Sequence, residues 1–176
     1  AGRMRLLKDH AMDPQRRYYH PEAGYNSRMT NIQAALGCAQ LSRIEELQGK
    51  RHQILQWYQQ SMGNIRGISL NPAMPWAEPV NWMVSAVLRD TGAMQRDPLL
   101  KQLKKAGIDS RPFFIPVHQL PPYRRFRCVG VSGSELKAAE EIAAAGFNLP
   151  TTPDLTQQEV ERIVHRVSEI LEGRVR

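Results

Sequence analysis

The sequence predicts an α+β fold, in which a few helices cover a small sheet, and three observations favour it. Apolar residues recur at helical spacing across residues 30–62 and again across residues 160–171. Residues 81–89 are rich in β-forming side chains and follow a proline-rich loop. The predicted order is long helix, strand, strand, helix, strand, helix, helix, which lacks the strict strand–helix alternation of parallel α/β folds.

The N-terminal part of the chain is predicted to be irregular before one long helix begins. Residues 1–10 have the pattern of a helix end, and residues 11–28 hold prolines, a glycine and many polar and aromatic side chains. Thr30 followed by Gln33 forms a capping box, in which each side chain satisfies a backbone N–H group that the helix leaves free. The apolar spacing then continues to Met62, and the Gly-Asn pair that follows ends the helix.

The strands of the C-terminal part are predicted from β-forming segments between turn residues. The segment GISLNP covers residues 67–72, and NWMVSAVLR covers residues 81–89 and is expected to be buried. Residues 110–117 form a third candidate that Pro116 cuts short, so this strand is expected to be short or to lie at a sheet edge.

The helices of this part are predicted from their capping residues. Asp97 is expected as the N-cap of the first, with Pro98 at the first helical position and Gly107 at its end. Two further capping boxes open the last two helices: Ser132 with Glu135, and Thr156 with Glu159. The first of these two helices is expected to end near Ala145.

Composition narrows the class of protein. The chain has 176 residues, 41% of them hydrophobic, which is enough for one domain with its own core. No apolar run has the length of a membrane span and the N-terminus has no signal-peptide pattern, so a cytoplasmic protein is expected.

The chain begins without Met and in mid-pattern, which predicts a piece of a longer protein. Two cysteines are too few for a disulfide framework; Cys38 is expected in the core, and Cys128 lies among arginines.

The net charge of +7 favours an anionic partner, although the basic residues are not gathered in one block. Lys101, Lys104 and Lys105 lie on a predicted helix and are expected on its solvated face. No zinc-ligand spacing, aromatic RNA-binding motif or helix-turn-helix pattern is present. We therefore expect neither a metal site nor nucleic-acid binding.

A polar segment, Tyr-Asn-Ser-Arg at residues 25–28, precedes the long helix. Free N–H groups and the helix dipole at a helix N-terminus favour negative charge, and an Arg there adds a fork suited to phosphate or carboxylate. Asn26 and Arg28 are therefore candidates for an anion site. The alternative is that Asn26 and Ser27 only make the hydrogen bonds of a turn.

Two other segments carry candidate binding residues. Prolines stiffen residues 111–123 and fix the directions of Arg111, His118 and Tyr123, as in a binding loop, although His118 can equally be a satisfied surface residue. Basic and aromatic residues interleave at 16–21, which suits stacking on a nucleotide or a protein interface. The residues alone support an α+β domain that binds an anion.

Three stretches together resemble one known family. They are LLKDHAMDPQRRYYHPEAGYNSRMTNIQAALGCAQLSRIEEL, AGIDSRPFFIPVHQLPPY and FNLPTTPDLTQQEVERIVHRV, in this order along the chain. They resemble the DegT/DnrJ/EryC1/StrS family of pyridoxal-phosphate (PLP)-dependent aminotransferases, which act on nucleotide-linked keto sugars. The Arg-Arg-Tyr-Tyr-His-Pro and NWMVSAVL stretches look most like the branch that forms GDP-perosamine.

The resemblance implies a role for each candidate residue. Asn26 matches the family's Asn that reaches across a homodimer to the PLP phosphate of the other subunit, and Arg28 matches the Arg that shapes the same anionic site. His118 and Tyr123 match positions near the sugar nucleotide, where Arg111 is expected to assist.

The resemblance also implies how the chain divides. Residues 1–28 correspond to the tail of the large domain and a cofactor-side loop, residues 29–62 to a long connecting helix, and residues 63–176 to the small C-terminal α+β domain of a fold-type-I PLP enzyme. The large domain is mostly absent, and the family's cofactor lysine lies upstream of the match. Phe113 and Phe114 are expected to pack.

The implied function belongs to the parent protein, since no lysine of this chain has the cofactor lysine's sequence context. That protein is expected to move an amino group from an amino acid, such as glutamate, to a nucleotide-linked keto sugar such as GDP-4-keto-6-deoxymannose, and the chain alone to be inactive. Two alternatives stay open. One is a sugar dehydratase of the family, in which another residue replaces the lysine, and the other is a binding domain without catalysis.

Overall fold

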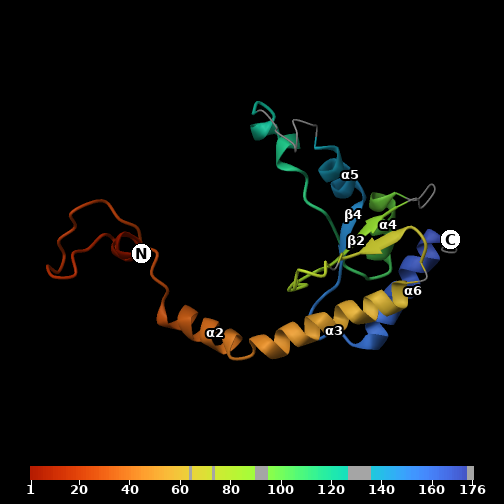
Figure 1. Cartoon of the computed structure of the whole chain (residues 1–176), viewed down its shortest axis with the longest axis horizontal. Helices are drawn as coiled ribbons and strands as arrows, with labels where there is room; N and C mark the ends of the chain where they lie inside the picture. Colours follow the sequence, from red (N-terminus) through yellow and green to blue (C-terminus); the bar gives the residue numbers. More distant parts are fainter. Residues whose placement is uncertain (64, 73, 90–94, 127–135, 174–176) are drawn as a thin grey trace. The chain divides into compact units, whose positions relative to one another are not determined.

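The computed structural model describes residues 1–63, 65–72, 74–89, 95–126 and 136–173 (Figure 1). Internal contacts divide the chain into two compact units, Ala1–Ile44 and Glu45–Arg176. The described part of the first unit holds two helices, and the sheet lies in the second unit.

The first unit consists of α1 (Gly2–Leu7), a long loop and α2 (Asn31–Leu41). The capping box predicted at the start of α2 is confirmed. The Gln33 N–H donates to Thr30 Oγ1 at an N···O distance of 3.3 Å, and the Thr30 N–H donates to Gln33 Oε1 at 2.9 Å. These bonds satisfy two backbone donors, so the helix begins at a residue that the sequence already marks.

The prediction of one helix across residues 30–62 is wrong. The structure has two helices, α2 and α3 (Ile44–Met62), with a turn at Ser42 and Arg43 between them. The Ser42 hydroxyl donates to the Ala39 carbonyl oxygen (O···O 3.0 Å) and so competes with the backbone of the helix. The apolar spacing continues across this turn, and it therefore could not reveal the break.

The prediction that Cys38 is a core residue is also wrong. Cys38 is exposed, and none of the 11 residues of α2 is buried. Helical spacing shows which side chains share a face, but burial requires a second surface against that face. The exposed apolar residues of this helix include Ile32, Leu36 and Leu41.

The second unit is built on a four-stranded sheet with the order β1-β2-β4-β3, and Figure 1 labels its two inner strands. Its strands are β1 (Ile68–Leu70), β2 (Val84–Leu88), β3 (Arg111–Pro112) and β4 (Gly146–Leu149). All neighbouring strands are antiparallel. The prediction that the strand near residue 111 is short or lies at an edge is confirmed, since β3 has two residues and is the last strand of the order. An edge position suits Pro112, which has no N–H group to donate to a neighbouring strand.

Strand β4 was not predicted from the sequence pattern. It has four residues and begins at Gly146, directly after the last residue of α5 (Lys137–Ala145). It lies between β2 and β3, with Val84 opposite Leu149 and Pro112 opposite Phe147. Such a short segment carries little periodicity of its own, and its pairing partners lie far away in the sequence.

The core lies on one face of the sheet, where the buried residues of α3, α4 (Arg96–Lys105) and α6 (Gln157–Leu171) meet alternate residues of β2 and β4. Along β2 the buried and half-buried residues alternate, as expected for a strand with one face toward a core. The strand residues of the core are Val84, Ala86, Leu88, Phe147 and Leu149.

Tyr58 of α3 is fully buried in this core, and its hydroxyl donates to the Pro150 carbonyl oxygen (O···O 3.0 Å). Burial away from water disfavours the charged form and raises the pKa of Tyr58. The bond joins α3 to the segment after β4, and it gives the buried hydroxyl a partner.

Helix α4 begins two residues earlier than predicted. Its N-cap is Gln95, so Asp97 and Pro98 lie within the first turn. Proline is tolerated there because the first-turn N–H groups have no partner inside the helix, and Asp97 pairs with Arg96 (Nε···Oδ1 2.7 Å). The prediction that Gly107 ends this helix is confirmed. Its φ of +75° is a left-handed conformation that glycine adopts at low cost.

Two further predictions about α4 and α5 are confirmed, and two others fall on residues that the structure does not describe. The three lysines of α4 are exposed, as expected of a solvated face. Helix α5 ends at Ala145, as predicted. The capping box of Ser132 and Glu135, and Cys128, lie outside the described residues.

The third capping box is confirmed at α6. The Glu159 N–H donates to Thr156 Oγ1 (N···O 3.3 Å), and Glu159 Oε2 accepts from the Thr156 N–H and hydroxyl, each at 2.8 Å. These hydrogen bonds favour the carboxylate, and they lower the pKa of Glu159. The buried residues of α6 match the predicted apolar face; they are Val160, Ile163, Val164, Val167 and Ile170.

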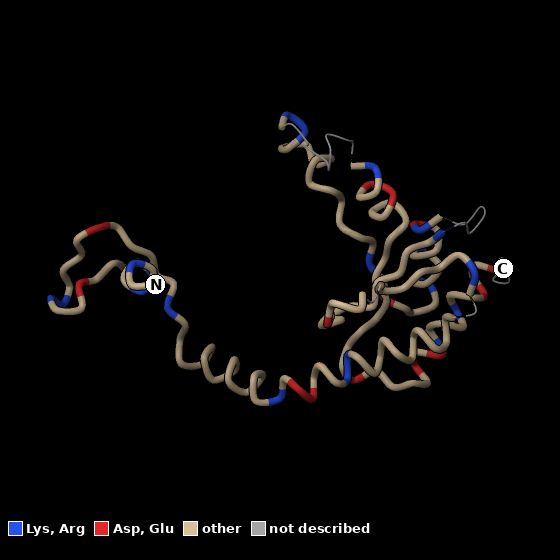
Figure 2. Tube along the Cα trace, viewed as in Figure 1, with Lys and Arg blue, Asp and Glu red and all other residues tan. Residues whose placement is uncertain are grey.

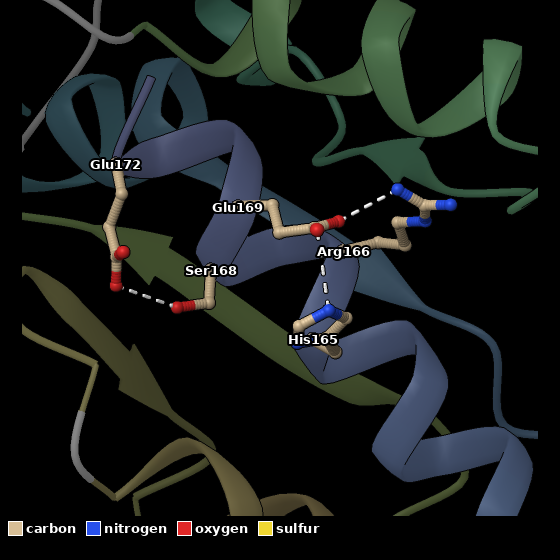
Figure 3. A network of polar contacts seen from close by, with 5 residues as sticks. All are labelled: His165, Arg166, Ser168, Glu169 and Glu172. Atoms are coloured by element: carbon tan, nitrogen blue, oxygen red, sulfur yellow. Dashed lines mark hydrogen bonds and ion pairs between the residues drawn. The ribbon is translucent and has the colours of Figure 1, made fainter. Parts of the chain in front are cut away.

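The opposite face of α6 carries a local set of polar contacts (Figure 3). Glu169 Oε2 accepts from Arg166 Nη1 at 2.7 Å, and Glu169 Oε1 lies 3.3 Å from His165 Nε2. The Ser168 hydroxyl donates to Glu172 Oε1 at 3.0 Å. Pairs three or four residues apart on an exposed helix each contribute about 0.2–0.5 kcal/mol, so this set stabilises the helix.

Replacing Thr156 with alanine is expected to lower the free energy of unfolding by about 1 kcal/mol at pH 7, because the N-cap hydroxyl is lost. Since the folded pKa of Glu159 lies below its unfolded value, the bonds to its carboxylate stabilise the fold above the unfolded pKa. That stabilisation is lost as the pH falls through the folded pKa. Urea unfolding at neutral and acidic pH measures both effects, and the difference from wild type should shrink in acid.

Thr152→Ala is the matched control, since Thr152 is exposed and its side chain has no partner among the described residues. Its effect is expected within about 0.5 kcal/mol at either pH. Equal losses from the two substitutions would contradict the capping role.

Candidate functional site

Backbone hydrogen bonds fix the loop between α1 and α2 around Asn26. The His10 N–H donates to the Tyr25 carbonyl oxygen (N···O 2.8 Å), and the Tyr25 N–H donates to the Leu7 carbonyl oxygen (2.7 Å). An isolated antiparallel bridge pairs Asp9 with Asn26. The backbone around Asn26 is therefore held by Leu7, Asp9 and His10, at and just after the end of α1.

Asn26 and Arg28 differ in what their side chains contact. Arg28 forms an ion pair with Asp9, at 3.2 Å from Nη1 to Oδ2. The Asn26 amide is exposed and has no hydrogen-bond partner among the described residues. Asn26 thus offers a free amide to a ligand, whereas the guanidinium of Arg28 is held by a carboxylate that the sequence did not point out.

The same loop requires a glycine at residue 24. Ala11 is fully buried, and its φ of 52° lies in the left-handed region, as does the φ of 56° at His10. A Cβ atom on Gly24 would overlap the backbone of both residues. The loop that carries Asn26 therefore depends on the close approach of two backbone segments, which only glycine permits here.

The interleaved basic and aromatic residues of the loop contact one another. The Arg16 guanidinium lies 4.6 Å from the centre of the Tyr19 ring, and that of Arg17 lies 4.9 Å from the centre of the Tyr18 ring. These are cation–π contacts between exposed side chains. They hold the aromatic rings of the segment against its arginines.

His118 and Tyr123 lie on two consecutive 3-10 turns, η1 (Val117–Gln119) and η2 (Pro121–Tyr123). The Tyr123 ring is about half exposed and tilts against Phe126, with 6.4 Å between the ring centres. The His118 ring is largely buried, with its Nε2 at 2.7 Å from Glu140 Oε1 of α5. The structure therefore attaches this proline-stiffened loop to a helix through one side-chain pair.

Arg111 lies on the edge strand β3, with its guanidinium exposed and 3.9 Å from Asp109. It borders a small hollow of about 260 Å³ with Ser110 and Thr151. The Ser110 hydroxyl oxygen is buried and has no hydrogen-bond partner in the described part of the chain. The hollow thus combines a cation with two hydroxyl groups.

The prediction that both phenylalanines pack holds for one of them. Phe113 is half-buried, and its N–H donates to the Gly146 carbonyl oxygen (N···O 3.0 Å). Phe114 is 92% exposed, so its prediction is wrong. Burial requires a surface packed against the ring, and the Phe114 ring is left almost fully exposed.

A larger cleft lies on the face of the sheet away from the core, and the sequence analysis did not identify it. It has a volume of about 670 Å³ and apolar walls, including the exposed rings of Trp82 and Phe114. Its floor is a polar chain. The Asn71 side chain accepts from the Ser85 N–H (2.6 Å), and the Ser85 hydroxyl donates to Asn148 Oδ1 (2.8 Å). Each floor residue is bonded to its neighbour.

The candidate residues fall into two groups that belong to different units. Asn26 and Arg28 lie in the first unit, and Arg111, His118 and Tyr123 lie in the second. Along both units Lys and Arg are interspersed with Asp and Glu (Figure 2). Within the described residues no group of three or more His, Cys, Asp or Glu is placed to hold a metal ion. None of the described helices is both long and apolar enough to cross a membrane.

Comparison with known proteins assigns the family. The family model of the DegT/DnrJ/EryC1/StrS aminotransferases matches residues 1–168. The chain belongs to this family. The resemblance seen in the sequence is thereby confirmed.

The relatives of this family member include GDP-perosamine synthases. That of Caulobacter vibrioides is 38% identical over 172 residues, which cover 97% of this chain and 45% of the synthase. That of Escherichia coli O157:H7 is 30% identical over 163 residues, which cover 93% of this chain and 42% of the synthase. The chain therefore spans less than half the length of these relatives.

Solved structures confirm the fold class. DesV of S. venezuelae, solved in complex with a ketimine intermediate, matches with a TM-score of 0.81 and 27% identity, over 97% of this chain and 44% of that one. Helicobacter pylori PseC, an aminotransferase, matches with a TM-score of 0.84 and 23% identity, over 98% and 46%. The chain thus has the mixed helix and sheet fold of the matching part of these aminotransferases.

Proposed function

We propose that this chain completes the cofactor and substrate sites of a PLP-dependent sugar-nucleotide aminotransferase. In this proposal Asn26 and Arg28 meet the PLP phosphate, and Arg111, His118 and Tyr123 serve the sugar nucleotide. The observation that supports it most is the free Asn26 amide, held by the backbone bridge to Asp9. An exposed polar side chain on a fixed backbone is pre-organised for a ligand.

The donor set of the loop fits a phosphate group. An amide N–H and a guanidinium are both hydrogen-bond donors, and Arg28 retains donors beyond those that face Asp9. PLP, when bound, supplies the electron sink that lets an amino group pass between substrates. The part of the chain described here holds and orients the phosphate, and the family's cofactor lysine is expected upstream of Ala1.

The proposed reaction transfers an amino group from an amino acid, such as glutamate, to a nucleotide-linked keto sugar such as GDP-4-keto-6-deoxymannose. The GDP-perosamine synthases among the relatives favour this substrate. A homodimer follows from the proposal, because Asn26 is then placed to reach the cofactor of the other subunit. The 176-residue chain alone is expected to transfer no amino group.

The test compares the 176-residue chain with the same reading frame extended upstream. PLP binding is followed by visible absorption, and amino transfer from glutamate to the keto sugar by product analysis. We expect binding and transfer only in the extended protein. Removal of the sugar's hydroxyl group instead of amination would indicate the dehydratase, and no response to PLP would indicate a binding domain.

In the extended protein, Asn26→Ala is expected to weaken PLP binding by about 10- to 100-fold, the scale of one hydrogen bond to a charged group. Ser27→Ala is the matched control, because the Ser27 side chain is exposed and has no partner among the described residues. PLP affinity that Asn26→Ala leaves unchanged would argue against the phosphate contact.

A further inference from the structure

His118 and Glu140 form a pair that none of the sequence patterns indicated. His118 lies on η1, Glu140 lies on α5, and 22 residues separate them in the chain. The distance from Nε2 to Oε1 is 2.7 Å, with the His118 side chain 16% exposed and the Glu140 side chain 42% exposed. The contact is short and partly shielded from water.

The chemistry of the pair decides which ring nitrogen is free. A carboxylate only accepts hydrogen bonds, so a ring nitrogen at this distance from it must carry the proton. In the neutral imidazole the other nitrogen is then an acceptor. Of the two neutral tautomers of His118, Glu140 therefore selects the one with a proton on Nε2 and a bare Nδ1.

The backbone around His118 adds stiffness to this arrangement. The Gln119 N–H donates to the Pro116 carbonyl oxygen (2.9 Å), and the Leu120 N–H donates to the Val117 carbonyl oxygen (3.1 Å). These bonds hold the backbone of His118, so its side chain can move only by rotation about its own bonds. The bond to Glu140 removes that freedom, because it holds Nε2 against α5.

Two charged residues near Glu140 do not compete with His118 for its carboxylate. Arg96 and Glu141 border the same hollow of about 540 Å³ as Glu140. Arg96 pairs with Asp97 and also donates to the Ala143 carbonyl oxygen, at the end of α5. Glu141 carries the same charge as Glu140. The 2.7 Å distance places His118 Nε2 in direct contact with the Glu140 carboxylate.

We propose that Glu140 is a positioning residue that fixes the tautomer and the direction of His118, so that Nδ1 is the nitrogen offered to a ligand. The proposal rests on the proposed function, in which His118 meets the sugar nucleotide. A bare Nδ1 accepts a hydrogen bond, and the ligand group that suits it is a hydroxyl of the sugar. Glu140 acts through His118 and touches no substrate itself.

The first experiment observes the His118 ring proton in the ¹⁵N-labelled 176-residue chain by ¹H–¹⁵N correlation through the ring. We expect an exchange-protected proton on Nε2, which His118→Ala assigns by its disappearance. Glu140→Ala should remove the protection, because the acceptor is lost. Glu140→Gln should keep it, because the amide oxygen still accepts.

Glu141→Ala is the matched control, since Glu141 is the next residue of α5 and is exposed. It should leave the ring proton unchanged. A ring proton that persists in Glu140→Ala, or one that is found on Nδ1 in the wild type, would overturn the proposal. Backbone amide spectra of each variant show whether the fold is intact.

The second experiment measures kcat and KM of the extended protein. Glu140→Ala is expected to raise KM for the nucleotide sugar by about tenfold, the scale of one hydrogen bond, and Glu140→Gln to restore most of it. An unchanged KM would overturn the proposal even where the ring proton is lost. If the extended wild-type protein transferred no amino group, the proposed function would be refuted. That outcome is measured without any Glu140 variant, so it is distinct from a failure of the present proposal.

Discussion

Replacing Gly24 with alanine is expected to dismantle the loop that positions Asn26. The added Cβ atom would overlap the backbone of His10 and Ala11, and backbone atoms cannot move aside as the end of a flexible side chain can. The bonds that join His10 to Tyr25 and Tyr25 to Leu7 should then break. Hydrogen exchange of the His10 and Tyr25 amides should accelerate by roughly 100-fold, which corresponds to about 3 kcal/mol of local stability.

Gly37→Ala provides the control for this substitution. Gly37 lies in α2, and a Cβ atom there would meet nothing within 4 Å. Alanine in a helix is favoured over glycine by about 1 kcal/mol, so exchange in the loop should stay as in the wild type. In the extended protein, Gly24→Ala should also weaken PLP binding at least as much as Asn26→Ala does. Amides that exchange at the same rate in Gly24→Ala and wild type would contradict the close approach.

Phe147→Ala is expected to give the largest loss of global stability. Phe147 is fully buried, lies on the inner strand β4 and is paired with Ala86 on one side and Pro112 on the other. Removing a buried phenylalanine ring costs about 3–5 kcal/mol, because apolar area is lost and a cavity remains. Urea unfolding of the chain should show this loss, with the melting temperature lower by roughly 10 °C.

The chain offers a matched phenylalanine as control. Phe114 is 92% exposed, and Phe114→Ala should change the free energy of unfolding by no more than about 0.5 kcal/mol. Similar losses for the two substitutions would mean that the burial of Phe147 is not what stabilises the sheet.

Local features of the fold could be predicted because their causes lie within a few residues. The capping boxes at Thr30 and Thr156 each involve a partner three residues away, and both formed as expected. The helix-ending conformation of Gly107 is likewise a property of one residue and its neighbours. The turn at Ser42 was missed, since a single hydroxyl that competes with the backbone does not disturb the apolar spacing.

The candidate site could be predicted only in part. The family resemblance indicated Asn26, Arg28 and His118, but it did not indicate the carboxylates that hold two of them. Asp9 lies 19 residues from Arg28, and Glu140 lies 22 residues from His118. No periodicity or spacing connects residues at such separations, because only the folded backbone brings them together.

The sequence by itself determined the fold class, the starts of α2 and α6, the family and the residues to examine. The fold class and the helix starts depend on patterns that act over a turn of helix or a short strand, and the family depends on the order of longer stretches along the chain. The tertiary structure alone decided the place of β4 between β2 and β3, the exposure of α2 and Phe114, the ion pair of Arg28 with Asp9, and the contact of His118 with Glu140. These depend on contacts between distant segments, whose free energy arises only once the surfaces meet and water is excluded from between them.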